Sequence, residues 1–202
     1  MADIILPSEP LKQVLHDPFG FGVVFKHEIY QNPNRFFAQW SQSTYYRTIP
    51  FLLQLFTNPV ESIYLATAIF QILTHIFILY LLSVFISGKY NIFNKDFILS
   101  AFLISPLFQV FGYNRTMGII DWAPTYTFFY ALPLGFLLLF FLPFYKTYWL
   151  KQNENYNLII KILLVLLTVF VTLNGPLIPG VVIILCPMVL MILWLNNFNI
   201  LK

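Results

Sequence analysis

Charged side chains are scarce in this sequence. Asp, Glu, Lys and Arg together make up 9% of its 202 residues, against about a quarter of a typical soluble domain. The formal net charge is only +3, and the basic residues are scattered along the chain. Proteins that bind nucleic acids gather Lys and Arg on one face, so the sequence predicts no nucleic-acid partner.

Cysteine is also nearly absent. The single Cys186 excludes a disulfide framework and a cysteine-rich metal site. Because it lies within an apolar run, we expect it to be a small buried hydrophobic residue. His16 and His27 lack the spacing of metal ligands. We therefore expect no metal site, and nothing in the sequence identifies a cofactor.

Hydrophobic side chains are abundant instead. They form 59% of the chain, with 23 Phe and 12 Tyr, and the mean hydropathy is +0.76. A soluble globule could not bury that much apolar surface. The sequence therefore predicts an all-α, polytopic membrane helix bundle whose partners are lipids or other membrane helices.

Five apolar runs approach the length of about 20 residues that a helix needs to cross a bilayer. They are Val60 to Ser87, Phe97 to Phe111, Thr125 to Tyr145, Leu158 to Leu173 and Leu177 to Leu195. These runs predict about five transmembrane helices. They also divide the chain into an aromatic tail over residues 1–59, a bundle over 60–195 and a short C-terminal tail over 196–202.

Three local signals refine the prediction for these helices. Asn58-Pro59-Val60-Glu61 supplies an N-cap, a proline at the first helical position and an early carboxylate, so the first span should begin there. Pro133 predicts a kink in the third span. The Asn174-Gly175-Pro176 stretch predicts a tight turn that makes the last two helices antiparallel neighbours.

Loop charges predict the orientation. With five spans, the short loops 88–96 and 146–157 fall on one side, and they carry Lys89, Lys95, Lys146 and Lys151. That side nets +4 and the other nets −1. Since short cytoplasmic loops are enriched in lysine and arginine, we expect the C-terminus in the cytoplasm and the N-terminal tail outside.

The tail is too aromatic for a disordered linker. In NRFFAQWSQSTYYR, residues 34–47, Phe36, Phe37 and Trp40 follow one helical side, which favours a short interfacial helix. The stretch IPFLLQLF, residues 49–56, is too short to span a bilayer. We therefore expect two or three short elements lying flat on the outer surface.

Export of such a tail needs a signal that residues 1–59 do not contain. We therefore expect an additional transmembrane helix upstream of Met1 in the gene. An inverted topology is the alternative, and the four lysines of the short loops argue against it.

The segments HDPFGFGVVFKHEIYQNPNRFFAQW, residues 16–40, and NPVESIYLATAIFQ, residues 58–71, carry a resemblance in layout. The chain resembles the polytopic glycosyltransferases of the C superfamily, whose first outer loop holds juxtamembrane helices and an acidic catalytic residue. The resemblance extends over residues 1–130 and departs from the family in lacking its first span. Abundant Phe, Ile, Asn, Tyr and Lys also resemble membrane proteins of AT-rich bacteria, which implies the bacterial cytoplasmic membrane.

The resemblance implies that Asp17 or Glu28 takes the acidic catalytic role. A carboxylate at the outer surface could act as general base on an acceptor hydroxyl while a polyprenyl-phosphate leaves its sugar. Arg115 is the first candidate for binding that phosphate, because a guanidinium matches its oxygens, and Arg35 and Arg47 are alternatives.

Each of these residues also has a structural interpretation. Asp17, before Pro18, is typical of a turn or cap residue, and Glu28 of a solvated charge. Arg115 could form an ion pair with Asp121, its supporting residue, or reach to lipid headgroups.

Gln71 and His75 share one face of the first span, because they are four residues apart. They indicate either an interhelical hydrogen bond or a proton or substrate path. Three functions remain open: a partial or truncated lipid-linked glycosyltransferase, a non-catalytic membrane scaffold or subunit, and a small transporter.

Overall fold

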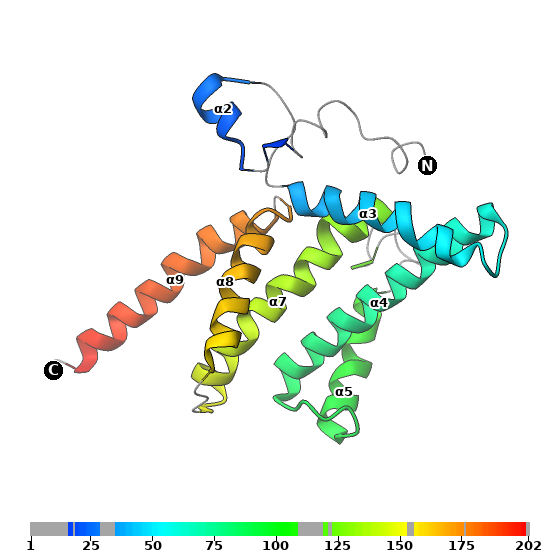
Figure 1. Cartoon of the computed structure of the whole chain (residues 1–202). Coiled ribbons are helices and arrows are strands. Elements are labelled where there is room, and N and C mark those ends of the chain that lie inside the picture. Colours follow the sequence, from blue (N-terminus) through cyan, green and yellow to red (C-terminus); the bar gives the residue numbers. More distant parts are fainter. Residues whose placement is uncertain are drawn as a thin grey trace.

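The structure is a computed structural model, and it describes residues 16–17, 19–28, 35–108, 119–120, 123–152, 156–175 and 177–200. Within these ranges the chain is helical and contains no strand. The expectation of an all-α protein is therefore confirmed for the described part of the chain. Figure 1 shows long, roughly aligned helices with one helix lying across their ends.

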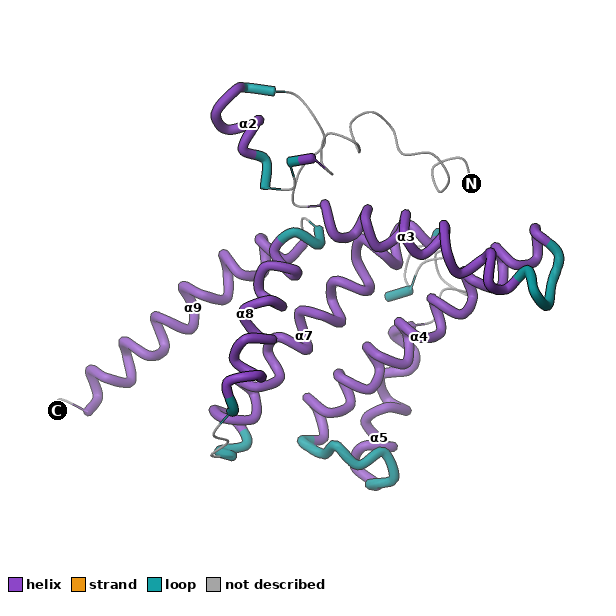
Figure 2. The backbone as a smooth tube through the Cα atoms, in the orientation of Figure 1, coloured by secondary structure: helices purple, strands orange, loops and turns teal. Residues whose placement is uncertain are grey.

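Helices make up most of the described chain (Figure 2). Their bounds are α2 Phe21–Lys26, α3 Phe36–Leu53, α4 Pro59–Ser87, α5 Lys95–Ile104, the 3₁₀ turn η3 Ser105–Phe108, α6 Pro124–Tyr126, η4 Thr127–Ala131, α7 Leu132–Phe144, η5 Tyr145–Trp149, α8 Leu158–Thr172 and α9 Leu177–Ile200. The segments η4 and η5 are π-helical, so α6 to η5 form one continuous helix.

Five membrane-spanning helices are not confirmed. Within the part of the chain that the structure describes, two helices are long and apolar enough to cross a membrane, namely α4 and the continuous helix over 124–149. The expected second span is reduced to α5, ten residues long and so about 15 Å, followed by η3 at Ser105 and Pro106. The helix α8 is also apolar but has only 15 residues.

The helix α4 begins where the sequence predicted. The side chain of Asn58 accepts a hydrogen bond from the backbone N–H of Glu61 at 2.8 Å, and Pro59 is the first helical residue. The helix ends at Gly88, whose φ of 65° is left-handed, a conformation that glycine adopts without a steric penalty. Asn94 and Asn157 cap α5 and α8 in the same way as Asn58 caps α4.

The helix α3 lies across the ends of the other helices (Figure 1). Its buried residues recur every fourth position, at Ala38, Gln42, Tyr46 and Pro50, as expected for a helix with one packed face. It continues through Pro50 to Leu53, so the two short elements expected over 34–56 are one 18-residue helix.

The connections divide between two ends of the molecule. The α4–α5 and α7–α8 connections lie at one end, and α3 and the α8–α9 turn lie at the other (Figures 1 and 2). A cation–π contact links the two lysine-bearing connections, because the Lys146 ammonium lies 4.4 Å from the centre of the Tyr90 ring. The structure therefore brings together the loops that the sequence placed on one side.

The helix over 124–149 widens next to its prolines. Pro133 has no N–H and cannot donate to the carbonyl of Phe129, and η4 lies immediately before it. Near the other end, the carbonyl of Pro143 accepts hydrogen bonds from Thr147 Oγ1 at 3.0 Å and Tyr156 Oη at 3.4 Å. Next to the position where the sequence predicted a kink, the structure has a π-helical segment.

Three buried clusters hold the helices together. Ile78, Ile104 and Phe108 join α4 to α5 and η3, Ala38 packs α3 on Phe128 and Phe129, and Leu137, Val171 and Ile178 join α7, α8 and α9. The last cluster lies near the α8–α9 turn, beyond which α9 diverges from α8 (Figure 1). The last two helices are therefore neighbours near their turn only.

A substitution at Gly135 tests the contact between α4 and α7. A β-carbon at Gly135 would lie 2.6 Å from Cε1 of Phe77, closer than atoms pack. We expect Gly135→Ala to push the helices apart and to lower the free energy of unfolding in detergent by about 1–3 kcal/mol.

Gly180 of α9 is the matched control, because a β-carbon there would meet nothing within 4 Å. Gly180→Ala should leave the melting temperature unchanged or raise it, since alanine favours helix over glycine. Equal melting temperatures for the two variants would contradict a close approach of α4 and α7.

Candidate functional site

The two carboxylates proposed from the sequence, Asp17 and Glu28, meet beside α2. Asp17 accepts hydrogen bonds from the backbone N–H groups of Phe21 at 3.0 Å and Gly22 at 2.6 Å, and so caps this short helix. His27 adopts a left-handed φ of 55° that turns the chain back. A β-carbon on Gly22 would collide with Glu28 Oε2 and lie 3.2 Å from Asp17 Oδ2, so both carboxylates approach one point.

The two carboxylates differ in their hydrogen bonding. Both oxygens of Asp17 accept backbone hydrogen bonds, which matches the cap interpretation of this residue. Glu28 is exposed, and its backbone N–H donates to the carbonyl of Gly22 at 3.2 Å. Of the pair, Glu28 is therefore the better placed to accept a proton from a molecule in solvent.

Arg35 and Arg47 both belong to the α3 region but cannot serve one phosphate. Arg35 immediately precedes α3 and is half-buried, with its guanidinium carbon 5.9 Å from the centre of the Phe129 ring. Arg47 is exposed in the middle of α3, twelve residues and so about 18 Å further along. Arg35 is thus the arginine that faces the helix bundle.

Polar groups are buried on the segments that meet at Phe129. We call this region the polar junction; it is made of Arg35, Thr127, Phe129, Asn174 and Gly175. Thr127 and Asn174 are fully buried. Among the described residues, Arg35 Nε, Thr127 Oγ1 and both amide atoms of Asn174 are buried without a hydrogen-bond partner. Because buried polar atoms normally have partners, the polar junction has unused donors and acceptors and one positive charge.

Gly175 closes this junction against η4. A β-carbon at Gly175 would lie 2.9 Å from the carbonyl oxygen of Phe129, and its φ is 141°. Both facts favour glycine at this position. On the α3 side, the backbone N–H of Phe37 donates to the carbonyl of Leu173 at 3.0 Å, so the α8–α9 turn is fixed between α3 and η4.

Two tyrosines attach α3 to α4. Tyr45 Oη donates to the carbonyl of Ala66 at 2.8 Å, and Tyr46 Oη and Thr67 Oγ1 share a hydrogen bond of 2.8 Å. Burial raises the pKa of Tyr45 to about 12, with a contribution from Tyr46, and burial also raises the pKa of Tyr46. Both phenols are therefore neutral at physiological pH and stabilise the attachment as hydrogen-bonding groups.

The supporting residues Gln71 and His75 lie half-buried on α4. The His75 ring stacks on Phe108 of η3, with centroids 4.2 Å apart and an interplanar angle of 9°. His75 thus contributes to the packing of α4 against η3. Arg115 and Asp121 lie outside the described residues, so their proposed roles stay predictions.

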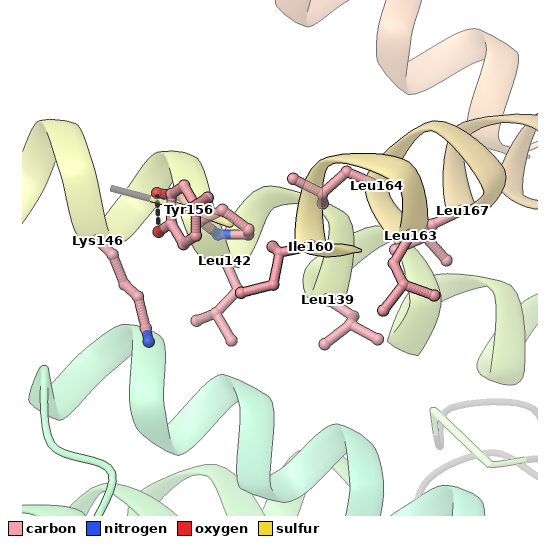
Figure 3. Close-up of a pocket in the computed structure, with 9 residues that line it drawn as sticks. Leu139, Leu142, Lys146, Tyr156, Ile160, Leu163, Leu164 and Leu167 are labelled. Carbon is pink, nitrogen blue, oxygen red and sulfur yellow. Dashed lines mark hydrogen bonds between the residues drawn. The ribbon is translucent and has the colours of Figure 1, made fainter. Parts of the chain in front are cut away.

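A cavity of about 320 Å³ lies between α7 and α8. Figure 3 shows its two ends. Aliphatic side chains line most of it, namely Leu139, Leu142, Ile160, Leu163, Leu164 and Leu167. Pro143, Lys146 and Tyr156 line the other end. The cavity is thus apolar along its length and polar at one end.

Sequence reasoning missed Thr127, Asn174 and the α7–α8 cavity. Asn174 was interpreted only as a turn residue. It is fully buried, and the next residue, Gly175, approaches Phe129, which is 45 positions before Asn174 in the chain. Asn174-Gly175 between two apolar runs was the available signal. The structure groups no three His, Cys, Asp or Glu side chains as a metal site within the described ranges.

Comparison of the chain with protein families, with curated proteins and with solved structures found no match in any of the three.

Proposed function

We propose that the chain is an integral protein of a bacterial cytoplasmic membrane that transfers a sugar from a polyprenyl-phosphate donor at the end carrying α2 and α3. Glu28 accepts the proton of the acceptor hydroxyl as its oxygen attacks the anomeric carbon. The bond from that carbon to the phosphate oxygen breaks, and the lipid phosphate leaves with the electron pair.

The polar junction is the observation that supports this proposal most. Its Arg35 guanidinium can form charge-assisted hydrogen bonds to phosphate oxygens, and the neighbouring Asn174 amide and Thr127 hydroxyl offer neutral donors. All three side chains have buried polar atoms with no hydrogen-bond partner among the described residues. An anion at this place would provide the partners that these groups lack.

The carboxylate pair lies at the same end of the molecule, which supports the proposal that this end carries out the reaction. Asp17 caps α2 and lies next to Glu28, and α2 lies on the α3 side of the bundle (Figure 1). In this mechanism Asp17 is a positioning residue that holds α2. Arg115 and Asp121 are further phosphate-binding and supporting residues of the same face in the proposal.

A non-catalytic subunit is the second candidate function, and the surface of α9 favours it. Large apolar side chains of α9 are exposed beyond the α8–α9 turn, namely Ile183, Ile184, Met188, Leu190, Met191 and Trp194. Contiguous exposed apolar patches contact lipid or a protein partner. A subunit role predicts that substitution of Glu28 leaves the cellular function intact.

The first test of the proposed chemistry is Glu28→Gln. We expect transfer of a labelled sugar from a polyprenyl-phosphate donor in proteoliposomes to fall about 100-fold or more, because the amide cannot accept the proton. The melting temperature should not change, since Glu28 is exposed. Glu61→Gln, at the exposed first turn of α4, is the matched control and should retain activity.

Asp17→Ala should differ from Glu28→Gln. Loss of the helix cap costs about 1 kcal/mol of stability, so this variant should lose protection of the α2 amides in hydrogen exchange. Full transfer activity in Glu28→Gln would contradict the proposed general base.

A second test compares two arginines of one region. We expect Arg35→Lys to weaken binding of a polyprenyl phosphate about tenfold, because an ammonium cannot reproduce the planar guanidinium fork. Arg47→Lys, at an exposed position of α3, should bind as the wild type does. Equal affinities of the two variants in native mass spectrometry would contradict a phosphate site at the polar junction.

The orientation is tested by thiol labelling in a Cys186→Ala background. The lysine-bearing loops are proposed to be cytoplasmic, so a cysteine at Asn91 should resist an impermeant reagent in intact cells. A cysteine at Lys26, the exposed last residue of α2, should react. The reverse labelling pattern would place the proposed active face in the cytoplasm, where this mechanism does not operate.

A further inference from the structure

The α7–α8 cavity has the shape of a site for one chain of an amphiphile. Its aliphatic residues come from two apolar helices, and Lys146 and Tyr156 lie together at one end (Figure 3). Its volume of about 320 Å³ is at the lower end of the range for ligand pockets. A ligand that fits this lining is apolar along its length and anionic at one end.

Aromatic and basic side chains indicate that the polar end of the cavity lies at the level of the lipid headgroups. Tyr148 and Trp149 of η5 are exposed there, and aromatic belts of this kind lie at membrane–water interfaces. Lys151 and Lys161 are also exposed near the same end. Clustered lysines at such a level attract anionic lipids.

The position of Lys146 matches a phosphate at this level. Its side chain lines the cavity, and its ammonium lies 4.4 Å from the centre of the Tyr90 ring. The cation–π contact holds the ammonium beside the polar end without neutralising its charge. On the other side, Leu163 is 57% exposed, so the apolar part of the cavity opens towards the surface of α8 that would face lipid.

We propose that the α7–α8 cavity binds an anionic phospholipid of the surrounding bilayer, with one acyl chain between Leu139, Leu163 and Leu164 and the phosphate at Lys146. This site lies at the opposite end of the molecule from the polar junction. It does not depend on sugar transfer, so it would operate equally in a catalyst or in a non-catalytic subunit.

The test uses the full chain in nanodiscs doped with a phosphatidylglycerol that carries a diazirine on one acyl chain. After irradiation, mass spectrometry should find adducts concentrated on Leu139, Leu163 and Leu164. Phe102 is the internal reference, because it is 73% exposed on α5 and would meet only the general lipid shell. Equal labelling of Phe102 and the cavity residues would overturn the proposal.

Charge variants test the headgroup contact separately. We expect Lys146→Gln to lower cavity labelling about fivefold, since one lysine near an anionic surface contributes about this factor, and Lys146→Arg to retain it. Lys151→Gln, at the same end but outside the cavity lining, should lower labelling less than Lys146→Gln does. The wild type labelled with a phosphatidylcholine probe should show a similar fivefold loss.

Three outcomes would each contradict the site. These are equal labelling by the two lipid probes, equal labelling in Lys146→Gln and Lys151→Gln, and labelling confined to the outer surface of α8. The comparison of lipid probes uses unaltered protein, so it decides the question even if Lys146→Gln does not fold. Flotation of the nanodiscs reports membrane insertion independently.

Discussion

The structure depends on α3 being fixed across the ends of the other helices. Hydrogen bonds attach it to three separate segments: Tyr45 Oη to the carbonyl of Ala66 in α4, Gln42 Nε2 to Thr125 Oγ1 at the start of the long helix, and the N–H of Phe37 to the carbonyl of Leu173 after α8. Each such bond contributes about 1 kcal/mol. Between them, small residues such as Ala38 and Ala66, both fully buried, allow close backbone approach. The helix α3 therefore holds together the ends of α4, of the long helix and of α8.

Pro133 and Gly175 then determine how η4 and the α8–α9 turn pack next to α3. Pro133 removes the helical partner of the Phe129 carbonyl, and the chain widens into η4 just before it. Gly175 approaches that same carbonyl, where a β-carbon would be only 2.9 Å away. Consequently the α8–α9 turn lies against η4, and Asn174 is drawn into the interior. π-Helical segments are frequent at functional sites, and this one carries the buried Thr127.

Sequence reasoning worked where the signal was local and failed where it was not. The start of α4 at Asn58 follows from a capping side chain and a proline that act within one turn, and the cap interpretation of Asp17 rests on the same short-range chemistry. The five expected spans are not confirmed, because hydropathy measures apolar length and does not register that α5 gives way to a 3₁₀ turn at Ser105. The burial of Asn174 could not be predicted, because it results from a contact between distant segments. The roles of Arg115 and Asp121 stay predictions.

The scarcity of charge explains why the two candidate sites lie at opposite ends. In the proposed membrane setting, an apolar helix bundle cannot hold many ionised groups at its centre, so cations gather where water and headgroups are near. Arg35 lies at the α3 end and Lys146 at the other (Figure 1), and each faces an aromatic ring, Phe129 and Tyr90 respectively. An aromatic ring attracts a cation without cancelling its charge. In the two proposals, Arg35 and Lys146 each bind the phosphate group of a lipid, an anion that is present at both surfaces of a membrane.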